Sequence, residues 1–353
     1  MRNYAASAPG KIIIMGEHAV VYGKPAWLAA INLRCRTTLV PRSDQVVEIT
    51  SKQLQFHEAT SLDDILRFTQ QSRAVWEQFQ QTNDPKILRA AAPREADLIP
   101  IAIGEALLHL DEVPRQGFSL VVDSEVPLGL GLGSSAAVAT SVVMCVSKFL
   151  GTTPDKARLT TIIHEVEKKK HGFPSGGDVA AAVYGRMIWY RRETEFLKCI
   201  SPLEDIDMGM LRNCVLIPTG RPTGSTGDAV SFVREQYQER PAETQLLFDQ
   251  IETLTKDGLI ALKRHDMAGL IHAINGCGDH LVQLGIVPQF AQAIIADIRQ
   301  AGGGAKISGK GGISGKAAGI ILAVHPEPQR IVAVAKKYDL PYWEIKVGVE
   351  GVA

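Results

Sequence analysis

A segment in which glycine and leucine alternate directly ahead of an apolar run is the feature of this sequence that most restricts its fold. Residues 126–137 read Val-Pro-Leu-Gly-Leu-Gly-Leu-Gly-Ser-Ser-Ala-Ala, and the apolar residues 136–150 that follow predict a helix. Glycine allows turns that are closed to other residues and lets a bulky anion approach the backbone. Two hydroxyl residues, Ser134 and Ser135, stand where a helix N-cap belongs. We therefore expect a loop that opens onto the start of a helix.

This junction is a candidate phosphate site. The free N–H groups of a first helical turn and the positive end of the helix dipole both favour an anion. Ser134 or Ser135 would in addition offer a hydroxyl to a magnesium ion that bridges phosphates. The glycine spacing fits neither the GxxxxGK[ST] loop nor the GxGxxG fingerprint. A glycine-rich turn that only packs closely is the structural alternative.

A second segment, residues 8–26, places polar residues on either side of an expected strand. Lys11 lies at the mouth of the strand predicted over residues 12–15, where it is a candidate cation near a reacting oxygen. Glu17 and His18 follow the strand and are candidate hydrogen-bonding groups for a polar substrate. A surface lysine and a capping pair are the alternative interpretation.

Two more segments carry candidate residues. In residues 171–185, Asp178 follows a Gly-Gly pair and precedes a run of small residues, so it either caps a helix or accepts the proton of an attacking alcohol. Glu167 lies four residues before His171 and is a candidate metal ligand, with a solvated glutamate as the alternative. Residues 304–315 form another glycine-rich stretch that would fold over the phosphates or the substrate.

The remaining patterns predict a mixture of strands and helices in the α+β class. With 353 residues the chain is longer than one core usually supports, so we expect two domains, residues 1–200 and 201–353. A glycine-rich loop is expected over residues 302–315. Strands are expected over residues 12–15, 37–40, 118–122, 187–190, 214–217, 318–324 and 342–349. Helices are expected over residues 62–79, 97–110, 136–150, 159–170 and 328–338, with two or three more between 228 and 299.

Charge and cysteine content exclude several classes of protein. Lys plus Arg equals Asp plus Glu, which argues against a surface for nucleic acid. The five cysteines are scattered singly, without the spacing of a zinc site or a disulfide framework, which favours a reducing, cytoplasmic compartment. The longest apolar stretches, such as residues 136–146, are shorter than the ~20 residues of a membrane span. We expect neither nucleic acid nor a membrane as a partner.

Taken in this order, the four segments resemble those of the GHMP kinases, the superfamily of galactokinase, homoserine kinase, mevalonate kinase and phosphomevalonate kinase. The glycine-leucine motif is specific for the superfamily, while residues 8–26 and 171–178 are similar to the mevalonate kinases in particular. The resemblance extends from Ala8 to Gly351. It implies a two-domain fold, with an N-terminal domain like ribosomal protein S5 domain 2 and a ferredoxin-like C-terminal domain, and ATP and substrate between them.

Carried over position by position, the resemblance also implies roles for individual residues. Lys11 would help to activate the alcohol, and Asp178 would act as its base or orienting carboxylate. The magnesium ligands would be Ser135 and Glu167. The phosphates of ATP would be cradled by Gly129, Leu130, Gly131, Leu132, Gly133, Ser134 and Ser135. The substrate pocket for mevalonate would contain Glu17, His18 and Thr226, or Ser225 in place of Thr226. ATP, mevalonate and Mg2+ are thus the implied ligands, and a homodimer would suit the family.

The sequence departs from the mevalonate kinase pattern in ways that leave the acceptor open. Val179 replaces the asparagine that usually follows the aspartate, and Lys310 replaces an alanine in the third glycine motif. The block after Asp178 is similar to phosphomevalonate kinases, for which Arg221, Lys24 and Lys310 would be available to bind a substrate phosphate.

A non-catalytic binding protein and a decarboxylase would also fit the same four segments. A nucleotide- or ligand-binding protein on this scaffold would bind without turnover, although such a protein is free to lose the Lys11 and Asp178 that this chain retains. A decarboxylase relative would phosphorylate its substrate only transiently and release CO2.

Overall fold

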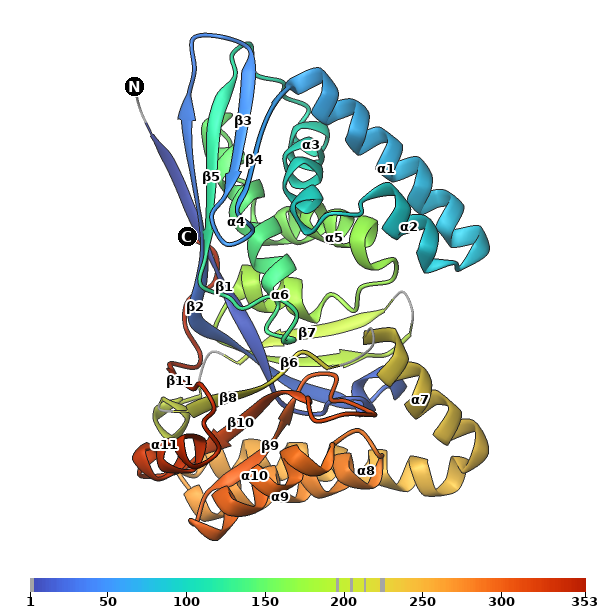
Figure 1. Cartoon of the computed structure of the whole chain (residues 1–353), viewed down its shortest axis with the longest axis vertical. Helices are drawn as coiled ribbons and strands as arrows, with labels where there is room; N and C mark the ends of the chain where they lie inside the picture. Colours follow the sequence, from blue (N-terminus) through green and yellow to red (C-terminus); the bar gives the residue numbers. More distant parts are fainter. Residues whose placement is uncertain (1–2, 195–196, 204–205, 213, 223–225) are drawn as a thin grey trace.

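Within the residues that the computed structural model describes (3–194, 197–203, 206–212, 214–222 and 226–353, with only the backbone for 226–228), the strands form two sheets (Figure 1). The first sheet has seven strands and the second has four. The strands of the first sheet are β1 (Tyr4–Met15), β2 (Pro25–Pro41), β3 (Val46–Ser51), β4 (Phe56–Ser61), β5 (Phe118–Ser124), β6 (Met187–Arg192) and β7 (Lys198–Pro202). Those of the second are β8 (Cys214–Gly220), β9 (Gly304–Ser308), β10 (Gly319–Val324) and β11 (Trp343–Ile345).

The long strand β2 organises the first sheet. The order along the sheet is β4-β3-β5-β2-β6-β7, and β1 also pairs with β2. All of these pairings are antiparallel except that of β3 with β5. Register shifts between Pro9 and Gly10 and between Ile13 and Met15 lie on either side of Lys11, which is opposite Ala30. Because such irregularities bend a strand and re-aim its side chains, β1 is bent around the position of Lys11.

Helices cover one face of the first sheet (Figure 1). Helix α1 begins after Ser61, whose side chain accepts a hydrogen bond from the backbone N–H of Asp64 and so caps the helix. Helix α3 is buried on nearly all sides and packs against α1, α4 and α5. The helices of this half are α1 (Leu62–Thr82), α2 (Pro85–Ala91), α3 (Leu98–Leu110), α4 (Ser134–Phe149), α5 (Lys156–His171) and α6 (Gly177–Tyr184), with single 3-10 turns η1 (Ala19–Tyr22) and η2 (Glu95–Asp97).

The second sheet has the order β11-β8-β10-β9 and is antiparallel throughout. Helices α9 and α10 pack against β9, and α8 packs against α9 (Figure 1). The helices of this half are α7 (Thr226–Glu239), α8 (Pro241–Lys263), α9 (Met267–Gln283), α10 (Gln289–Gln300) and α11 (Pro328–Lys337), with the short turn η3 (Gly209–Leu211).

The last residues of the chain return from the second sheet to the first. Val347 forms a bridge with Ile31 in β2, and Glu350 forms one with Gly185 after α6. The backbones of Ser7 and Ala353 then exchange two hydrogen bonds of 3.0 Å. This return adds contacts between the two halves beyond those of β9 with β1.

Much of the predicted secondary structure is confirmed. Helices and strands lie where the apolar patterns placed them, and the α+β class is correct. The expected strands at residues 12–15 and 37–40 are parts of the much longer β1 and β2. The strand expected over residues 342–349 is limited to β11, with isolated bridges beyond it. The expected boundary between residues 200 and 201 falls inside β7.

Several predictions were wrong. Ser134 and Ser135 do not cap α4 but form its first turn, because Gly133 takes the cap position in the left-handed conformation. In the same way Gly176 precedes α6, so Asp178 lies within the first turn and not at the cap. Residues 302–315 are not a continuous loop, since β9 lies among them.

Other elements were missed or miscounted. The helices α7, α8, α9 and α10 occupy the region where two or three were expected. The β3–β4 hairpin, α2 and β7 were not predicted.

Candidate active site

Lys11 and Asp178 come together at the junction of β1 and α6. The ammonium of Lys11 lies 3.1 Å from Asp178 Oδ1. The lysine side chain is 6% exposed, whereas 39% of the aspartate side chain is exposed. The pair therefore has a buried cation and a carboxylate that a solute can reach. Asp178 also lies in the first turn of α6, where the helix dipole favours a negative charge.

The glycine-leucine loop lies against Lys11. Gly129, Gly131 and Gly133 all adopt positive φ angles, of 73°, 79° and 71°, which L-residues with side chains avoid. The backbone N–H of Lys11 donates to the carbonyl of Leu132 at 2.8 Å. A methyl group on Gly133 would lie 2.9 Å from Cγ of Lys11. The loop thus needs glycine both for its backbone conformation and, at Gly133, for its approach to the lysine.

A hydroxyl, a carboxylate and an imidazole meet where α4 begins and α5 ends. Ser135 Oγ donates to Glu167 Oε2 at 3.1 Å, and His171 Nε2 lies 3.3 Å from the same hydroxyl. The other carboxylate oxygen, Oε1 of Glu167, is buried without a hydrogen-bond partner among the described residues. Burial raises the pKa of Glu167; the charge of His171 lowers it in part, and the carboxylate of Asp178 raises it further. A cation would satisfy the unpaired oxygen and favour the ionised carboxylate.

Glu17 and His18 face the second half of the chain. The ammonium of Lys306 in β9 donates to Glu17 Oε1 and, at 2.8 Å, to the carbonyl of Ile307. His18, with φ at 58°, has its Nε2 2.9 Å from the carbonyl of Lys310. Burial raises the pKa of Glu17 in spite of the neighbouring Lys306, and burial lowers the pKa of His18. His18 is therefore neutral near pH 7, so its Nε2–H donates to the carbonyl and Nδ1 is left as an acceptor.

A further link joins β9 to β1. Ser308 Oγ donates to the carbonyl of Ile13 at 2.9 Å and accepts from the N–H of Ile13 at 3.1 Å. Lys306, Ser308 and Lys310 are alternate residues, and each contacts the segment from Ile13 to His18. Residues 304–315 are thereby held against residues 8–26.

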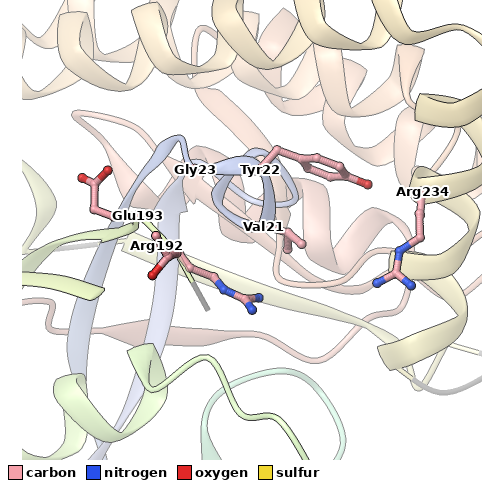
Figure 2. A pocket seen from close by; sticks show the side chains of 7 residues that line it. Val21, Tyr22, Gly23, Arg192, Glu193 and Arg234 are labelled. Carbon is pink, nitrogen blue, oxygen red and sulfur yellow. The ribbon is translucent and has the colours of Figure 1, made fainter. Parts of the chain in front are cut away.

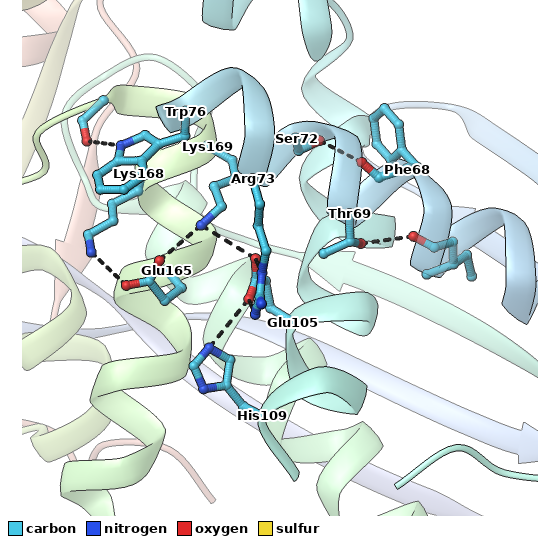
Figure 3. A network of polar contacts seen from close by, with 12 residues as sticks. Phe68, Thr69, Ser72, Arg73, Trp76, Glu105, His109, Glu165, Lys168 and Lys169 are labelled. Atoms are coloured by element: carbon cyan, nitrogen blue, oxygen red, sulfur yellow. Dashed lines mark hydrogen bonds and ion pairs between the residues drawn. The ribbon is translucent and has the colours of Figure 1, made fainter. Parts of the chain in front are cut away.

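A polar network fixes the end of α5 that carries Glu167 (Figure 3). The carboxylate of Glu105 on α3 is fully buried and is bound by Arg73 at 3.0 and 2.5 Å and by Lys169 at 3.4 Å. Lys169 also contacts Glu165 at 2.9 Å. The indole N–H of Trp76 donates to the carbonyl of Gly172 at 3.2 Å, just after the helix ends. These contacts tie α5 and the following turn to α1 and α3.

One of two pockets borders the residues of the site. It is lined by Ser134 and Ser135 at the start of α4, by Leu128 in the preceding loop, and by Leu54 and Leu98. The other opens where η1, the end of β6 and α7 meet, and Figure 2 shows it.

The structure brings together most of the residues predicted for the site. Lys11, Asp178, Glu167 and the glycine-leucine loop with its two serines surround one region. Thr226 is the first residue of α7, but its side chain and the whole of Ser225 lie outside the described residues.

The cations considered for a phosphorylated substrate have other contacts. Lys24 pairs with Asp249 at 2.5 Å and with Glu252 at 3.1 Å. Arg221 donates from Nε to the carbonyl of Leu128 at 3.2 Å. The contact of Lys310 with His18 is made by its backbone carbonyl and does not involve its ammonium group.

Sequence reasoning missed Lys306, Ser308 and the place of His171 beside Ser135. A lone lysine in a glycine-rich segment carries no signal of burial, because lysine is almost always exposed. The alternation of Lys306 and Ser308 within Gly-Ala-Lys-Ile-Ser was the available signal for a strand.

Comparison with known proteins identifies the family. Residues 101–186 match the model of the GHMP kinases N terminal domain. The chain is 30% identical over 350 residues to a mevalonate kinase of Pyrococcus horikoshii, a match that covers 94% of this chain and 91% of that protein. The chain belongs to the GHMP kinases. It is an ATP-dependent small-molecule kinase.

Solved structures show that the GHMP kinase fold extends over the whole chain. The mevalonate kinase of Methanococcus jannaschii matches with a TM-score of 0.81 at 20% identity and covers 98% of both chains. The mevalonate kinase of L. major in complex with R-mevalonate matches with a TM-score of 0.72 at 21% identity and covers 99% of this chain and 97% of that one. The two-domain α+β fold expected from the resemblance is confirmed. Among the described residues of this GHMP kinase, none of the helices has the length and apolar character needed to cross a bilayer.

Proposed function

We propose that this GHMP kinase transfers the γ-phosphoryl group of ATP to the 5-hydroxyl of mevalonate and so makes 5-phosphomevalonate in the mevalonate pathway to isoprenoid precursors. The observation that carries the proposal is the similarity to an archaeal mevalonate kinase along 94% of the chain. It supports a mevalonate kinase more strongly than the local likeness of residues 178–185 supports a phosphomevalonate kinase. The ion pairs of Lys24 with Asp249 and Glu252 also favour mevalonate.

The Lys11–Asp178 pair supports phosphoryl transfer to an alcohol. In our proposal the acceptor oxygen forms a bond to the γ-phosphorus as the bond from that phosphorus to the β,γ-bridging oxygen breaks. Asp178 Oδ2 accepts the hydroxyl proton, and the ammonium of Lys11, 3.1 Å from Oδ1, stabilises negative charge on the reacting oxygens. Because Lys11 is buried, its charge acts in a medium of low dielectric constant, where it is worth more than in water.

The loop and the first turn of α4 are suited to hold the phosphates of ATP. Residues 129–135 present backbone N–H groups at the positive end of α4, and the left-handed glycines keep the backbone bare of side chains there. The pocket lined by Leu128, Leu54 and Leu98 borders the same turn and would accept the adenosine end.

Ser135 and Glu167 fit a magnesium ion. Oε1 of Glu167 is buried and lacks a hydrogen-bond partner among the described residues. The hydroxyl of Ser135 lies beside the other carboxylate oxygen, Oε2, and is a second possible ligand. Oxygen ligands of this kind are those that Mg2+ takes in kinases, together with phosphate oxygens and water. When bound, the ion would neutralise charge on the transferred phosphoryl group. The chain's own part is to hold both ligands in place through the α3–α5 network.

Glu17, His18 and Thr226 are proposed to contact the acceptor. The neutral imidazole of His18 has Nδ1 as an acceptor for a substrate hydroxyl. Oε2 of Glu17 has no hydrogen-bond partner among the described residues, so it is available to a hydroxyl that reaches it.

The domain bounds, the compartment and the oligomeric state are proposed from the sequence alone. We divide the chain into domains at residues 1–200 and 201–353, and we expect a cytoplasmic enzyme, in keeping with its single cysteines and zero formal charge. We also propose a homodimer, on the basis of the family resemblance. Nucleic acid and membranes have no part in the proposed activity.

The test is the release of ADP from Mg-ATP, coupled to a second enzyme, with mevalonate and 5-phosphomevalonate offered separately and the product mass checked. We expect turnover of mevalonate and a product heavier by one phosphoryl group. Turnover of phosphomevalonate alone would refute the proposal in favour of a phosphomevalonate kinase. Release of CO2 would indicate a decarboxylase, and nucleotide binding without ADP release would indicate a non-catalytic protein.

A further inference from the structure

The turn between α5 and α6 joins the two carboxylates of the candidate site. Glu167 lies near the end of α5, Asp178 lies in the first turn of α6, and residues 172–176 between the helices belong to no helix or strand. Gly172 and Gly176, at the two ends of this turn, have positive φ angles of 69° and 87°. Backbone without helix or sheet pairing needs other hydrogen-bond partners where it is buried. The position of one carboxylate relative to the other therefore depends on what binds this turn.

Side-chain donors from three other elements bind the carbonyls of the turn. The phenol O–H of Tyr190 on β6 donates to the carbonyl of Ser175 at 2.6 Å. The ammonium of Lys198 on β7 donates to the carbonyl of Pro174 at 3.3 Å. At the start of the turn, the indole N–H of Trp76 on α1 binds the first carbonyl at 3.2 Å (Figure 3). The bond from Tyr190 is the shortest of the three and the closest to α6 along the chain.

The ring of Tyr190 packs against the helix that carries Asp178. The side chain is 2% exposed and belongs to a small apolar cluster with Ala180 and Ala181 of α6. A methyl group on Gly177 would lie 3.9 Å from Cδ2 of the ring, so the backbone at the start of α6 is close to it. The tyrosine thus contacts α6 through its ring and the preceding turn through its hydroxyl. Its own position is fixed by the pairing of β6 with β2.

Tyr190 is also close enough to Asp178 for the two side chains to interact electrostatically. Burial raises the pKa of Tyr190 to about 12, and the charge of Asp178 adds to the rise. The phenol therefore keeps its proton and donates it to the carbonyl of Ser175. Burial lowers the pKa of Lys198, since a charged donor loses more by leaving water than a neutral one. The neutral phenol is thus the donor better suited to a buried position beside this turn.

We propose that Tyr190 is a positioning residue for phosphoryl transfer, which holds the turn so that the carboxylate of Asp178 meets the acceptor hydroxyl beside Lys11. The inference rests on the proposed function and adds a residue that acts through the assigned base. An aspartate side chain is short, so its carboxylate moves with the backbone of α6. A displacement of about 1 Å at a reacting group is enough to cost on the order of 100-fold in rate. The hydroxyl of Tyr190 therefore affects the rate without contacting ATP or the acceptor.

Tyr190→Phe tests the inference because it removes the hydroxyl and keeps the ring. We expect kcat to fall by about 10- to 100-fold. KM for ATP and the Mg2+ concentration for half-maximal activity should stay within about twofold, because the phosphate loop and Glu167 lie on other elements. Lys198→Met, which removes the longer contact with the same turn, should lower kcat less. Tyr338→Phe is the matched control, since it removes a hydroxyl that binds Asp297 at 2.8 Å in the second half, and it should leave kcat unchanged.

The Asp178→Asn background separates positioning from a general loss of structure. Adding Tyr190→Phe to Asp178→Asn should change kcat by less than about threefold, because no carboxylate is left to place. Product mass after long incubations measures these low rates. An equal fall in kcat in both backgrounds would overturn the inference, and so would an unchanged kcat in Tyr190→Phe alone.

Failure of the proposed function gives a different result. A wild-type enzyme that does not phosphorylate mevalonate refutes that function, and the variants are then compared on the alcohol that it does phosphorylate. A fall in kcat that depends on Asp178 with that acceptor still supports the role of Tyr190. A wild-type protein that phosphorylates no alcohol would overturn both.

Discussion

Lys306 and Glu17 form an ion pair in which neither side chain has any exposed surface. The pair joins β9 of the second sheet to the turn after β1 of the first, 289 residues away along the chain. Removing one partner from such a pair leaves a buried charge without compensation, which is strongly destabilising. The ion pair therefore holds Glu17 and His18 in a fixed position against residues 304–315.

We expect Lys306→Met to lower the free energy of unfolding by about 3–5 kcal/mol. Urea denaturation followed by circular dichroism measures the change. The double variant Lys306→Met with Glu17→Leu should recover part of the loss, because it removes both charges. Arg67→Met breaks the exposed pair of Arg67 with Asp64 and serves as the control, with an expected loss below about 1 kcal/mol. Equal losses for Lys306→Met and Arg67→Met would contradict the prediction.

Asp178→Asn removes the carboxylate that we assign to the acceptor proton. We expect kcat to fall by about 10²- to 10⁴-fold, while KM for ATP changes little. Steady-state ADP release measures both. The same exchange at Asp123, an exposed residue paired with Lys52, should leave kcat unchanged. Wild-type turnover by Asp178→Asn would rule out the role of the carboxylate.

Alanine substitutions at Gly131 and Gly151 separate the cost of backbone strain from an effect on ATP binding. Both have positive φ angles, of 79° and 76°, and a methyl group on either would meet no atom within 4 Å. Alanine at each site should therefore cost a similar ~1 kcal/mol of stability through backbone strain alone. Only Gly131→Ala should also raise KM for ATP, because only Gly131 lies in the proposed phosphate loop. A matching rise in KM for Gly151→Ala would show that the effect is not local.

Glu167→Gln tests the proposed metal ligand. An amide oxygen binds Mg2+ more weakly than a carboxylate, so the Mg2+ concentration that gives half-maximal activity should rise by about tenfold or more. Magnesium titrations at saturating ATP and mevalonate measure it. Glu77→Gln is the control, because Glu77 is exposed on α1 and belongs to neither the proposed metal site nor the network that holds it. If the two variants depend equally on magnesium, Glu167 is not a ligand of the ion.

The network around Glu105 makes stability depend on pH. Burial alone would raise the pKa of Glu105, but the imidazole of His109 at 3.4 Å, the hydrogen bonds from Arg73 and the charge of Lys169 hold it at about 2, against 4.5 for an ordinary glutamate. Because the folded-state pKa is the lower one, the unfolded state binds more protons between these values. The stabilisation is thus fully present above about pH 4.5 and is lost as the pH falls toward 2.

The difference in the Glu105 pKa corresponds to a stabilisation on the order of 3 kcal/mol. We expect urea denaturation of the wild-type protein to give a free energy of unfolding that falls between about pH 5 and pH 3. In Glu105→Gln this fall should be smaller, whereas the exposed Glu77→Gln should retain it. An unchanged pH dependence in Glu105→Gln would show that another carboxylate is responsible.

The sequence by itself determined the elements whose signals are local. The glycine-leucine loop before an apolar run and the α+β mixture were predicted, because turn chemistry and hydrophobic period are written in neighbouring residues. The grouping of Lys11, Asp178 and Glu167 into one site came from the resemblance to the GHMP kinases and not from a local pattern. The bounds of α5 and α11 agreed with the structure to within a few residues for the same reason.

Only the tertiary structure decided what distant segments do to one another. Sequence patterns carry no sign that Lys306 is buried against Glu17, since burial of a charge is favourable only when its partner arrives from another part of the chain. The pocket where η1, the end of β6 and α7 meet likewise exists only because distant segments come together, and neither Arg192 nor Arg234, which line it, stands out in its own segment. Long-range pairing sets the environment of these side chains, and the environment sets their charge and their chemistry.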